Sequence, residues 1–415
     1  MVLFLMFLSA LNLINRFYYC VYFAALFFVL HPFRKVRLNA SVAVLLALGL
    51  FTMIFDPMSR SGILSLIKPY TFMVSYILGL SLFQNKERDR LDIGREEKKV
   101  AKVIYLMAAG TFAHFVLNIV TNVDIEERNI NDFWTQDTLA ATGHAAIACI
   151  SVGVAVAFLF SQKEKRKQIL GAAMLILIAL CNLVLAGRTL FLLIIITIVA
   201  AVVYISATEK RKMLKTVAIV LAVVVVLVFL YSANAFGIKD TIEDSNFYNR
   251  FFGTNATQDL DDDGRLDIKL DYLKDMLKYL WGGNRLHEIH GGYAHDLYLD
   301  THDNAGIIAF LAIVVYIVFS LVRAVKCIRN KRFDREIRLL VFCVYLVCNI
   351  MFWLEPIMRG LPWLLTAYCF IDGSVTYLLS QEERSRADYP ADSCDSSMDL
   401  PKRSPAGLVA HRYKR

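Results

Sequence analysis

Residues 168–207 read QILGAAMLILIALCNLVLAGRTLFLLIIITIVAAVVYISA. Two apolar runs, 168–186 and 190–207, are separated here only by Gly187, Arg188 and Thr189. Each run approaches the ~20 residues that a helix needs to cross the ~30 Å hydrocarbon core of a bilayer. Because lipid offers no hydrogen-bond partner to the backbone, helices are the expected spanning element. The stretch predicts two transmembrane helices joined by a tight turn.

The same pattern recurs along the chain, which is 57% hydrophobic and has a mean hydropathy of +0.50. Residues 1–30 contribute one broken span or two short ones. We therefore expect an all-α, polytopic membrane helix bundle of about 11 or 12 transmembrane helices in residues 1–380. Composition predicts a disordered cytoplasmic tail for 381–415. The remaining predicted spans are 40–56, 63–83, 100–120, 139–160, 214–232, 303–323, 338–354 and 361–380.

The net charge of +8 follows membrane topology and does not indicate nucleic-acid binding. Alternate short loops are rich in Lys and Arg, and the loops between them are nearly free of both. By the positive-inside rule, the basic loops and the C-terminus are cytoplasmic. The long polar loop at about 233–302 then faces outward. The basic loops lie at 34–37, 86–99, 163–167, 210–215 and 323–338.

Several cations collect on the predicted outer face, against this bias. Arg188 lies in the tight turn, Lys68 lies near the start of the span at 63–83, and Arg359 lies in the last external turn. Arg265 comes from the long loop. The planar guanidinium of arginine can grip a phosphate or diphosphate with two hydrogen bonds. The alternative for each residue is an interfacial side chain that reaches the lipid headgroups.

An acidic segment in the long loop has two interpretations. Asp259, Asp261, Asp263 and Asp267 match positions 1, 3, 5 and 9 of an EF-hand calcium loop. Leu270 stands where that loop needs a bidentate Glu, so calcium is the weaker interpretation. The stronger one is a helix start, in which the acidic residues complement the positive end of a helix dipole.

The expected helix begins near Leu266 and is amphipathic. Leucines recur at a spacing of three or four residues, and Gly282-Gly283 would end the helix after about four turns. Such a helix lies either across the outer membrane surface or over the bundle. The leucines are Leu266, Leu270, Leu273, Leu277 and Leu280.

Four of the eight histidines fall within residues 287–302. No pair has the spacing of a helical zinc motif and no cysteine joins them, so we expect no metal site. His295 immediately precedes the residues that return the loop to the membrane. A neutral imidazole there is a candidate general base.

Three short motifs occur in order in the second half of the chain. They are AGRT at 186–189, GRL at 264–266 followed by WGG at 281–283, and AHDLYL at 294–299 followed by NAGII at 304–308. In order, spacing and topology they resemble the O-antigen ligase / O-antigen polymerase superfamily of integral membrane glycosyltransferases. The resemblance covers roughly residues 139–380. Asp296 departs from the family pattern, which has Asn at that position.

This resemblance implies a metal-independent enzyme without a cofactor, on the outer face of the cytoplasmic membrane. Its donor would be an oligosaccharide on undecaprenyl diphosphate, and its acceptor a sugar hydroxyl of a glycan or lipid-linked glycan. Arg188 and Arg265 would hold the diphosphate, with Arg359 and Lys68 as further candidates, and His295 would act on the acceptor hydroxyl. The product would be a surface polysaccharide: O-antigen, capsule or exopolysaccharide.

Two questions stay open at the level of sequence. Polymerase and ligase differ in their acceptor, which composition does not identify. The alternative function is a transporter or flippase of lipid-linked oligosaccharides. Transporters often show internal repeats and polar sites at the membrane midplane, whereas the polar groups here gather at one face.

Overall fold

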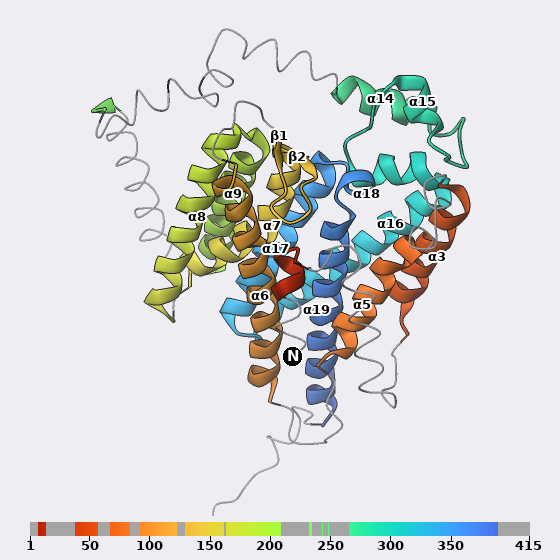
Figure 1. Ribbon diagram of the computed structural model, residues 1–415. Coiled ribbons are helices and arrows are strands. Elements are labelled where there is room, and N and C mark those ends of the chain that lie inside the picture. Colours follow the sequence, from red (N-terminus) through yellow and green to blue (C-terminus); the bar gives the residue numbers. More distant parts are fainter. Residues whose placement is uncertain are drawn as a thin grey trace, which may run out of the picture.

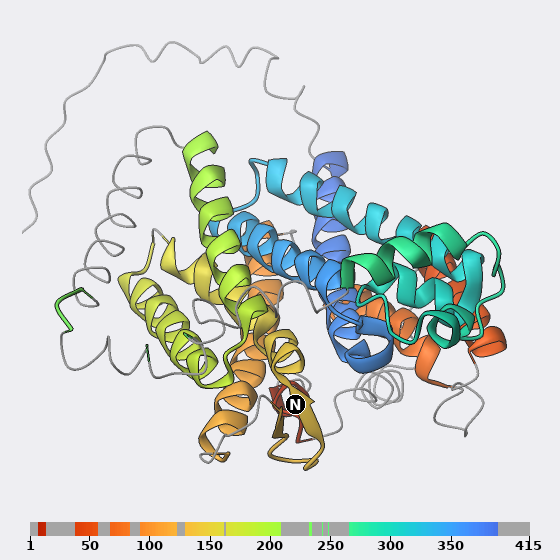
Figure 2. The same cartoon turned by 90° about the horizontal axis from the view of Figure 1, so that it is seen from above.

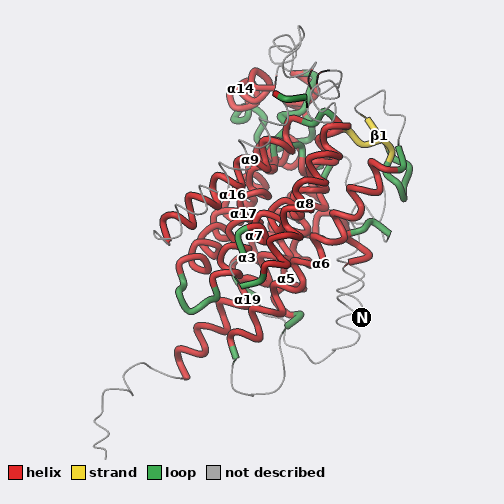
Figure 3. Tube along the Cα trace, turned by 90° about the vertical axis from the view of Figure 1, so that its left-hand side faces the viewer, coloured by secondary structure: helices red, strands yellow, loops and turns green. Residues whose placement is uncertain are grey.

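The computed structural model describes residues 7–13, 38–56, 67–83, 92–122, 129–161, 163–208, 232–234, 243, 248 and 265–388 (Figures 1 and 3). The predicted span at 214–232, most of 1–30 and the acidic residues 259–263 lie outside these ranges. In the part described, the chain is helical apart from one two-stranded hairpin, so the all-α prediction is confirmed.

The elements follow the predicted spans closely. In the first half they are α3 (Ala40–Phe55), η2 (Lys68–Tyr70), α5 (Thr71–Ser81), α6 (Ile93–Val120), β1 (Asn129–Asn131), β2 (Thr138–Ala140), α7 (Ala141–Leu159), α8 (Lys165–Leu185) and α9 (Arg188–Thr208). In the second half they are α14 (Arg265–Asp275), α15 (Arg285–His290), α16 (Leu297–Arg329), α17 (Arg335–Leu354), α18 (Ile357–Gly360) and α19 (Pro362–Asp388).

Six of the described helices are long and apolar enough to cross a membrane, which makes this a multi-pass membrane protein. They are α6, α7, α8, α9, α16 and α17. The last helix in the described ranges, α19, continues to Asp388, so the predicted domain end at 380 falls inside a helix.

The centre of the bundle is α7, whose apolar window is 89% buried, against 33% for α9 at the periphery. Small residues make this burial possible, because they let helix backbones approach closely. A Cβ added at Gly153 of α7 would lie 3.0 Å from the Cα of Val344 on α17. On α8, Gly171 likewise packs against the carbonyl of Ala155. In Figure 1, α8 and α9 lie on one side of this centre, and α3 and α5 on the other.

One buried ion pair lies between α16 and α19. Arg323 pairs with Asp372, whose carboxylate also accepts hydrogen bonds from the hydroxyls of Tyr316 and Tyr345, each at 3.0 Å. We expected Arg323 in a cytoplasmic loop, but it lies inside α16. A lone arginine among apolar helices is unfavourable, and the carboxylate of Asp372 removes that penalty.

Helix α16 is broken at Gly306, where the backbone has φ 82° and ψ −177°. Residues before the break are polar and buried, among them Asp300, His302 and Asp303. Residues after it form the apolar half that can cross the membrane. The long loop therefore re-enters the bundle through a short polar helix, which is continuous in sequence with a transmembrane helix.

The chain just before α15 pairs with the backbone at this break. The carbonyl of Leu280 accepts from the N–H of Ile307 at 2.8 Å, and the N–H of Asn284 donates to the carbonyl of Asp303 at 2.8 Å. Between them Gly282, at φ 72°, lies so close that an added Cβ would be 2.5 Å from the nitrogen of Gly306. Gly282 and Gly306, both with positive φ, thus allow the loop to pack directly against the backbone of the broken helix.

Helix α14 corrects the predicted end of the amphipathic helix. It ends at Asp275 and not near Gly282, because the chain must leave the helix to reach the break in α16. Its leucines do not pack on the protein. The buried face consists of Ile268, Tyr272 and Met276, which join Leu286 and other residues in a small hydrophobic cluster apart from the main core.

Positive-φ glycines in the loop provide a matched test of this pairing. In detergent, Gly282→Ala should lower the melting temperature much more than Gly291→Ala does. Gly291 has a similar φ of 69° but nothing within 4 Å of an added Cβ, so its change adds only about 1 kcal/mol of backbone strain. Equal shifts of the two variants, measured by intrinsic fluorescence on heating, would show that the close approach is not required.

Candidate functional site

A buried glutamate marks the junction of the loop and the bundle. Glu355 follows the last residue of α17 and precedes Pro356, whose ring prevents the helix from continuing. Its side chain is fully buried, and its Oε1 accepts a hydrogen bond from the hydroxyl of Thr189 at 3.4 Å. Thr189 is the second residue of α9, so Glu355 joins the ends of α17 and α9.

Two cations of α14 face this carboxyl. Burial raises the pKa of Glu355 to about 7, and the charge of Arg265, the hydrogen bond from Thr189 and the charge of Lys269 all act in the opposite direction. Arg265 and Lys269 lie one helical turn apart, so both approach Glu355 from the same edge of α14. The long loop therefore brings positive charge to a carboxyl of the bundle.

Lys269 also ties α14 to the start of α16. Its Nζ donates to the carbonyl of Trp353 at 2.7 Å and lies 3.8 Å from Oδ2 of Asp296. Asp296 caps α16 by accepting from the N–H of Leu299 at 2.7 Å. Burial raises the pKa of Asp296, and the Leu299 hydrogen bond and the charge of Lys269 oppose the shift. A capping role suits the Asp found at this position.

His295 stands directly before this cap, in the left-handed region at φ 54°. Few residues other than glycine adopt this conformation, and such residues gather at functional sites. Its ring is 6.3 Å from the ring of Tyr293, edge to face. The guanidinium of Arg359 lies over the other aromatic partner, the ring of Tyr293, at 4.5 Å from the ring centre. The half-buried His295 is thus held between the Asp296 cap and an aromatic neighbour.

The tight turn at Arg188 is built by a local hydrogen bond. Ala186 ends α8 in the left-handed conformation at φ 49°, and Nδ2 of Asn182 donates to the carbonyl of Gly187 at 2.7 Å. Arg188 then begins α9, one residue before the Thr189 that contacts Glu355. Arg188 and Arg265, predicted from separate motifs, therefore lie on elements that meet around Glu355.

Arg359 has a different environment. It pairs with the buried Asp303 of α16, and its Nη2 donates to Oδ1 of Asn284 at 2.8 Å. Asp303 also accepts from the backbone N–H of Leu286 at 2.8 Å. The charge of Arg359 is therefore balanced within the protein, where it holds α18, α15 and the broken helix together.

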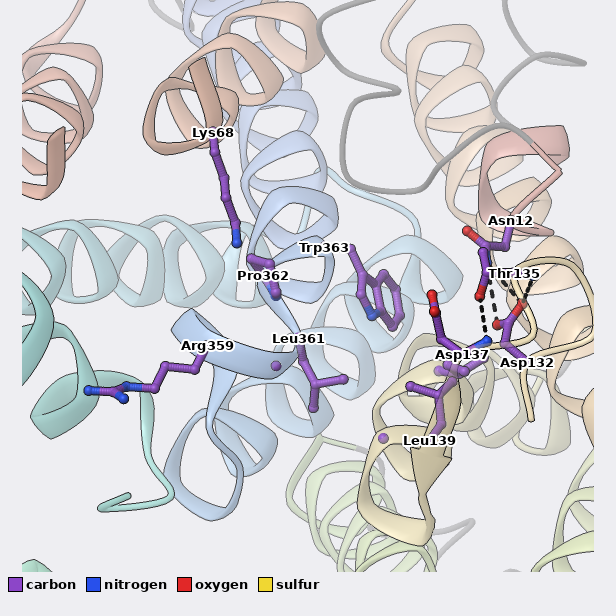
Figure 4. A pocket seen from close by; sticks show the side chains of 13 residues that line it. Asn12, Lys68, Asp132, Thr135, Asp137, Leu139, Arg359, Leu361, Pro362 and Trp363 are labelled. Atoms are coloured by element: carbon purple, nitrogen blue, oxygen red, sulfur yellow. Dashed lines mark hydrogen bonds between the residues drawn. The ribbon is translucent and has the colours of Figure 1, made fainter. Parts of the chain in front are cut away.

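Lys68 and Arg359 both line a cavity of about 340 Å³ (Figure 4). In Figure 4, Lys68 points toward Pro362, whereas Arg359 extends away from Trp363. The wall beyond Trp363 carries carboxylates, so the cavity has mixed charge. Its other lining residues are Asn12, Asp132, Thr135, Asp137, Leu139, Gly143, Ile147, Gly360 and Leu361.

The four histidines of residues 287–302 do not share a centre. His287 stacks on Tyr293 at 4.3 Å, His290 contacts Asp275 at 3.2 Å, and His302 is buried in α16. No group of three His, Cys, Asp or Glu residues with metal-binding geometry occurs in the described ranges.

The calcium interpretation reaches only one described residue. Asp267 lies in the first turn of α14, where a negative charge complements the helix dipole. The other acidic candidates, Asp259, Asp261 and Asp263, lie outside the described residues.

A comparison of the chain with protein-family models and with curated proteins finds no match in either. The resemblance to the ligase and polymerase superfamily therefore remains a prediction from the motifs. The site residues, too, are candidates that rest on their geometry.

Glu355 and Lys269 are the site residues that sequence reasoning missed. Neither residue belongs to the motifs, although an acidic residue at the end of an apolar span is a signal of function by default. The partner of each lies far along the sequence, and only the fold brings them together.

The Arg359 pair generates a prediction about stability. Arg359→Met should lower the free energy of unfolding by about 3–5 kcal/mol, because it leaves the buried Asp303 without its partner. Adding Asp303→Asn should recover part of the loss, as a double-mutant cycle in detergent would show. Two losses that simply add would mean that the pair is not coupled.

Proposed function

We propose that this protein is an integral membrane glycosyltransferase of the O-antigen ligase or polymerase type. It would transfer a glycan from undecaprenyl diphosphate to a sugar hydroxyl on the outer face of the cytoplasmic membrane. The observation that carries the proposal is the convergence at Glu355 of Arg265 from the loop and of the α9 turn that bears Arg188. The proposed topology has 11 or 12 spans in residues 1–380, an external loop and a cytoplasmic C-terminus.

The chemistry needs a cationic site beside a base. The acceptor hydroxyl attacks the anomeric carbon of the donor sugar and forms a new C–O bond, while the C–O bond to the diphosphate breaks. Arg188 and Arg265 balance the negative charge that develops on the departing undecaprenyl diphosphate. His295 takes the proton of the hydroxyl. Preorganised arginines in this role would make a metal ion unnecessary.

Glu355 gives the cations a partner when the donor is absent. A fully buried carboxyl with a pKa near 7 is charged in part of the molecules at neutral pH. In that form it attracts Arg265 and Lys269, and it repels an incoming diphosphate. When it is protonated, the cations become available to the donor. The glutamate would thus be a positioning residue for the two cations.

The cavity beside Lys68 supports a place for the acceptor. It combines the indole of Trp363 with the carboxylates of Asp132 and Asp137 and the amine of Lys68. An aromatic surface with a few hydrogen-bonding groups suits a sugar better than a diphosphate, which the carboxylates would repel. Chain growth on such an acceptor would be polymerase activity, and transfer to a separate lipid-linked glycan would be ligase activity.

One observation favours the second candidate, a transporter or flippase of lipid-linked oligosaccharides. Asp372 and Arg323 form an ion pair inside the helix bundle, and ionisable groups at such depth often mark transport pathways. Asp372→Asn separates the two functions. A transporter that uses this pair would lose translocation, whereas a transferase of the same folded state would retain glycan transfer.

Alanine at Arg188, Arg265 or His295 should reduce glycan transfer by about a hundredfold or more, as expected when one group acting on the transition state is removed. The assay uses purified protein in lipid vesicles with lipid-linked repeat units, with and without EDTA. Lys274→Ala, at an exposed position of the same helix as Arg265, is the matched control and should keep full activity. Full activity in all three site variants, or loss of activity on chelation, would contradict the mechanism.

Donor affinity should fall as the pH rises through 7, by up to about tenfold per pH unit above it. Burial raises the pKa of Glu355 to about 7, and a bound diphosphate raises it further, so donor binding takes up a proton. A diphosphate diester has no ionisation in this range. Glu355→Gln should flatten the profile, whereas Glu288→Gln, an exposed glutamate of α15, should leave it unchanged. Identical profiles for the native protein and both variants would exclude this role for Glu355.

A further inference from the structure

Helix α14 carries three separate faces. At about 100° per residue, the three leucines of the helix fall within about 60° of its circumference, and Leu277, in the turn just beyond Asp275, continues the same stripe. These side chains are between 45% and 71% exposed, which is unusual for a cluster of this size on a protein surface. They are Leu266, Leu270, Leu273 and Leu277. We call this set the leucine face.

A different face holds α14 to the protein. Ile268, Tyr272 and Met276 pack into the small loop cluster, and the hydroxyl of the fully buried Tyr272 donates to the carbonyl of Gly292 at 2.8 Å. The leucine face therefore takes no part in anchoring the helix to the protein.

The third face of α14 is charged but balanced. Lys274 pairs with Asp271 at 2.8 Å, and Lys278, just beyond the helix, pairs with Asp275 at 2.6 Å. These local pairs leave little net charge beside the leucines. A partner that covers the leucine face is therefore selected by apolar contact and not by opposite charge.

A second exposed apolar surface lies where the loop meets the apolar helix α3. Trp281, 60% exposed, stacks on Phe55 at the end of α3 with ring centres 5.5 Å apart. Leu50 and Ile54 of α3 are also exposed and extend this surface down the bundle. Figures 1 and 2 both show α14 over the first part of α16. An aromatic residue at such a junction is typical of the membrane–water interface.

We propose that α14 lies in the membrane interface with its leucine face immersed in the leaflet at the α18 end of the bundle. The occupant is the acyl region of the bilayer, reached through apolar contact and independent of lipid charge. Helices that lie in the interface have this division into one apolar and one polar side. The chain thus has a membrane contact that is not a transmembrane span.

This position has a consequence that rests on the proposed function. Lys269 lies on the edge of α14 between the leucine face and the buried face, and Arg265 lies one turn before it. With the leucines in the acyl region, both cations stand at the level of the lipid headgroups. A polyprenyl donor diffusing in that leaflet would present its diphosphate to them without leaving the membrane.

The test places a spin label on adjacent residues of the two faces. Leu273→Cys lies on the leucine face and Lys274→Cys on the charged face, and both side chains are exposed. The six described cysteines are buried and react poorly, and the other two, Cys20 and Cys394, are replaced by serine. The labelled full chain in lipid vesicles is exposed to oxygen, which concentrates in bilayers, and to a water-soluble nickel complex.

The label at 273 should show a several-fold higher ratio of oxygen to nickel accessibility than the label at 274, equally in zwitterionic and anionic vesicles. Leu277→Cys provides a second probe of the same face and should match 273. Equal ratios at 273 and 274 would overturn the proposal. So would a label at 273 shielded from both reagents, which would indicate a second protein surface, or a ratio that depends on anionic lipid. The readout does not depend on glycan transfer, so a failure of this proposal is distinguishable from a failure of the proposed function.

Discussion

The close approach of Gly282 to Gly306 is the constraint on which the loop and the site depend. There the chain leaving α14 lies closest against the broken backbone of α16, and both glycines have positive φ. The break lets a polar half-helix precede a membrane-crossing half. The Asp296 cap and His295 lie at the start of the polar half-helix, which this contact holds in place. The fold thus positions its candidate catalytic groups through contact between backbones and not through side-chain contacts.

At the loop–bundle junction, three carboxyls lie near cations. Asp303 pairs with Arg359, and Asp296 lies near Lys269. Glu355 faces Arg265 and Lys269. The first is an ion pair at close range, whereas Glu355 is buried deeply enough to change its charge near neutral pH. The junction therefore combines a close ion pair with a carboxyl that can change its charge near neutral pH, and perturbed carboxyls of this kind are common at functional sites.

Apolar run length and loop charge predict the helices at 40–55 and 165–208 nearly to the residue, because both signals are local. The break in α16 could not be predicted, since Gly306 is one of several glycines near the starts of spans and its need for positive φ arises from Gly282. The surroundings of Glu355 could not be predicted either, because its neighbours lie on α9 and α14. The leucines of α14 predicted an amphipathic helix, but not which face packs on the protein.

The ion pair between α16 and α19 has a consequence for how the chain enters the membrane. Arg323 is synthesised 49 residues ahead of Asp372. While α19 is still being made, α16 is already long enough to insert, and its arginine has no carboxylate beside it. Since Arg323 lies within two turns of the end of α16 at Arg329, its long side chain can extend to the nearby headgroups until α19 arrives. Pairing with Asp372 then draws this charge from the membrane surface into the bundle and holds α19 against α16.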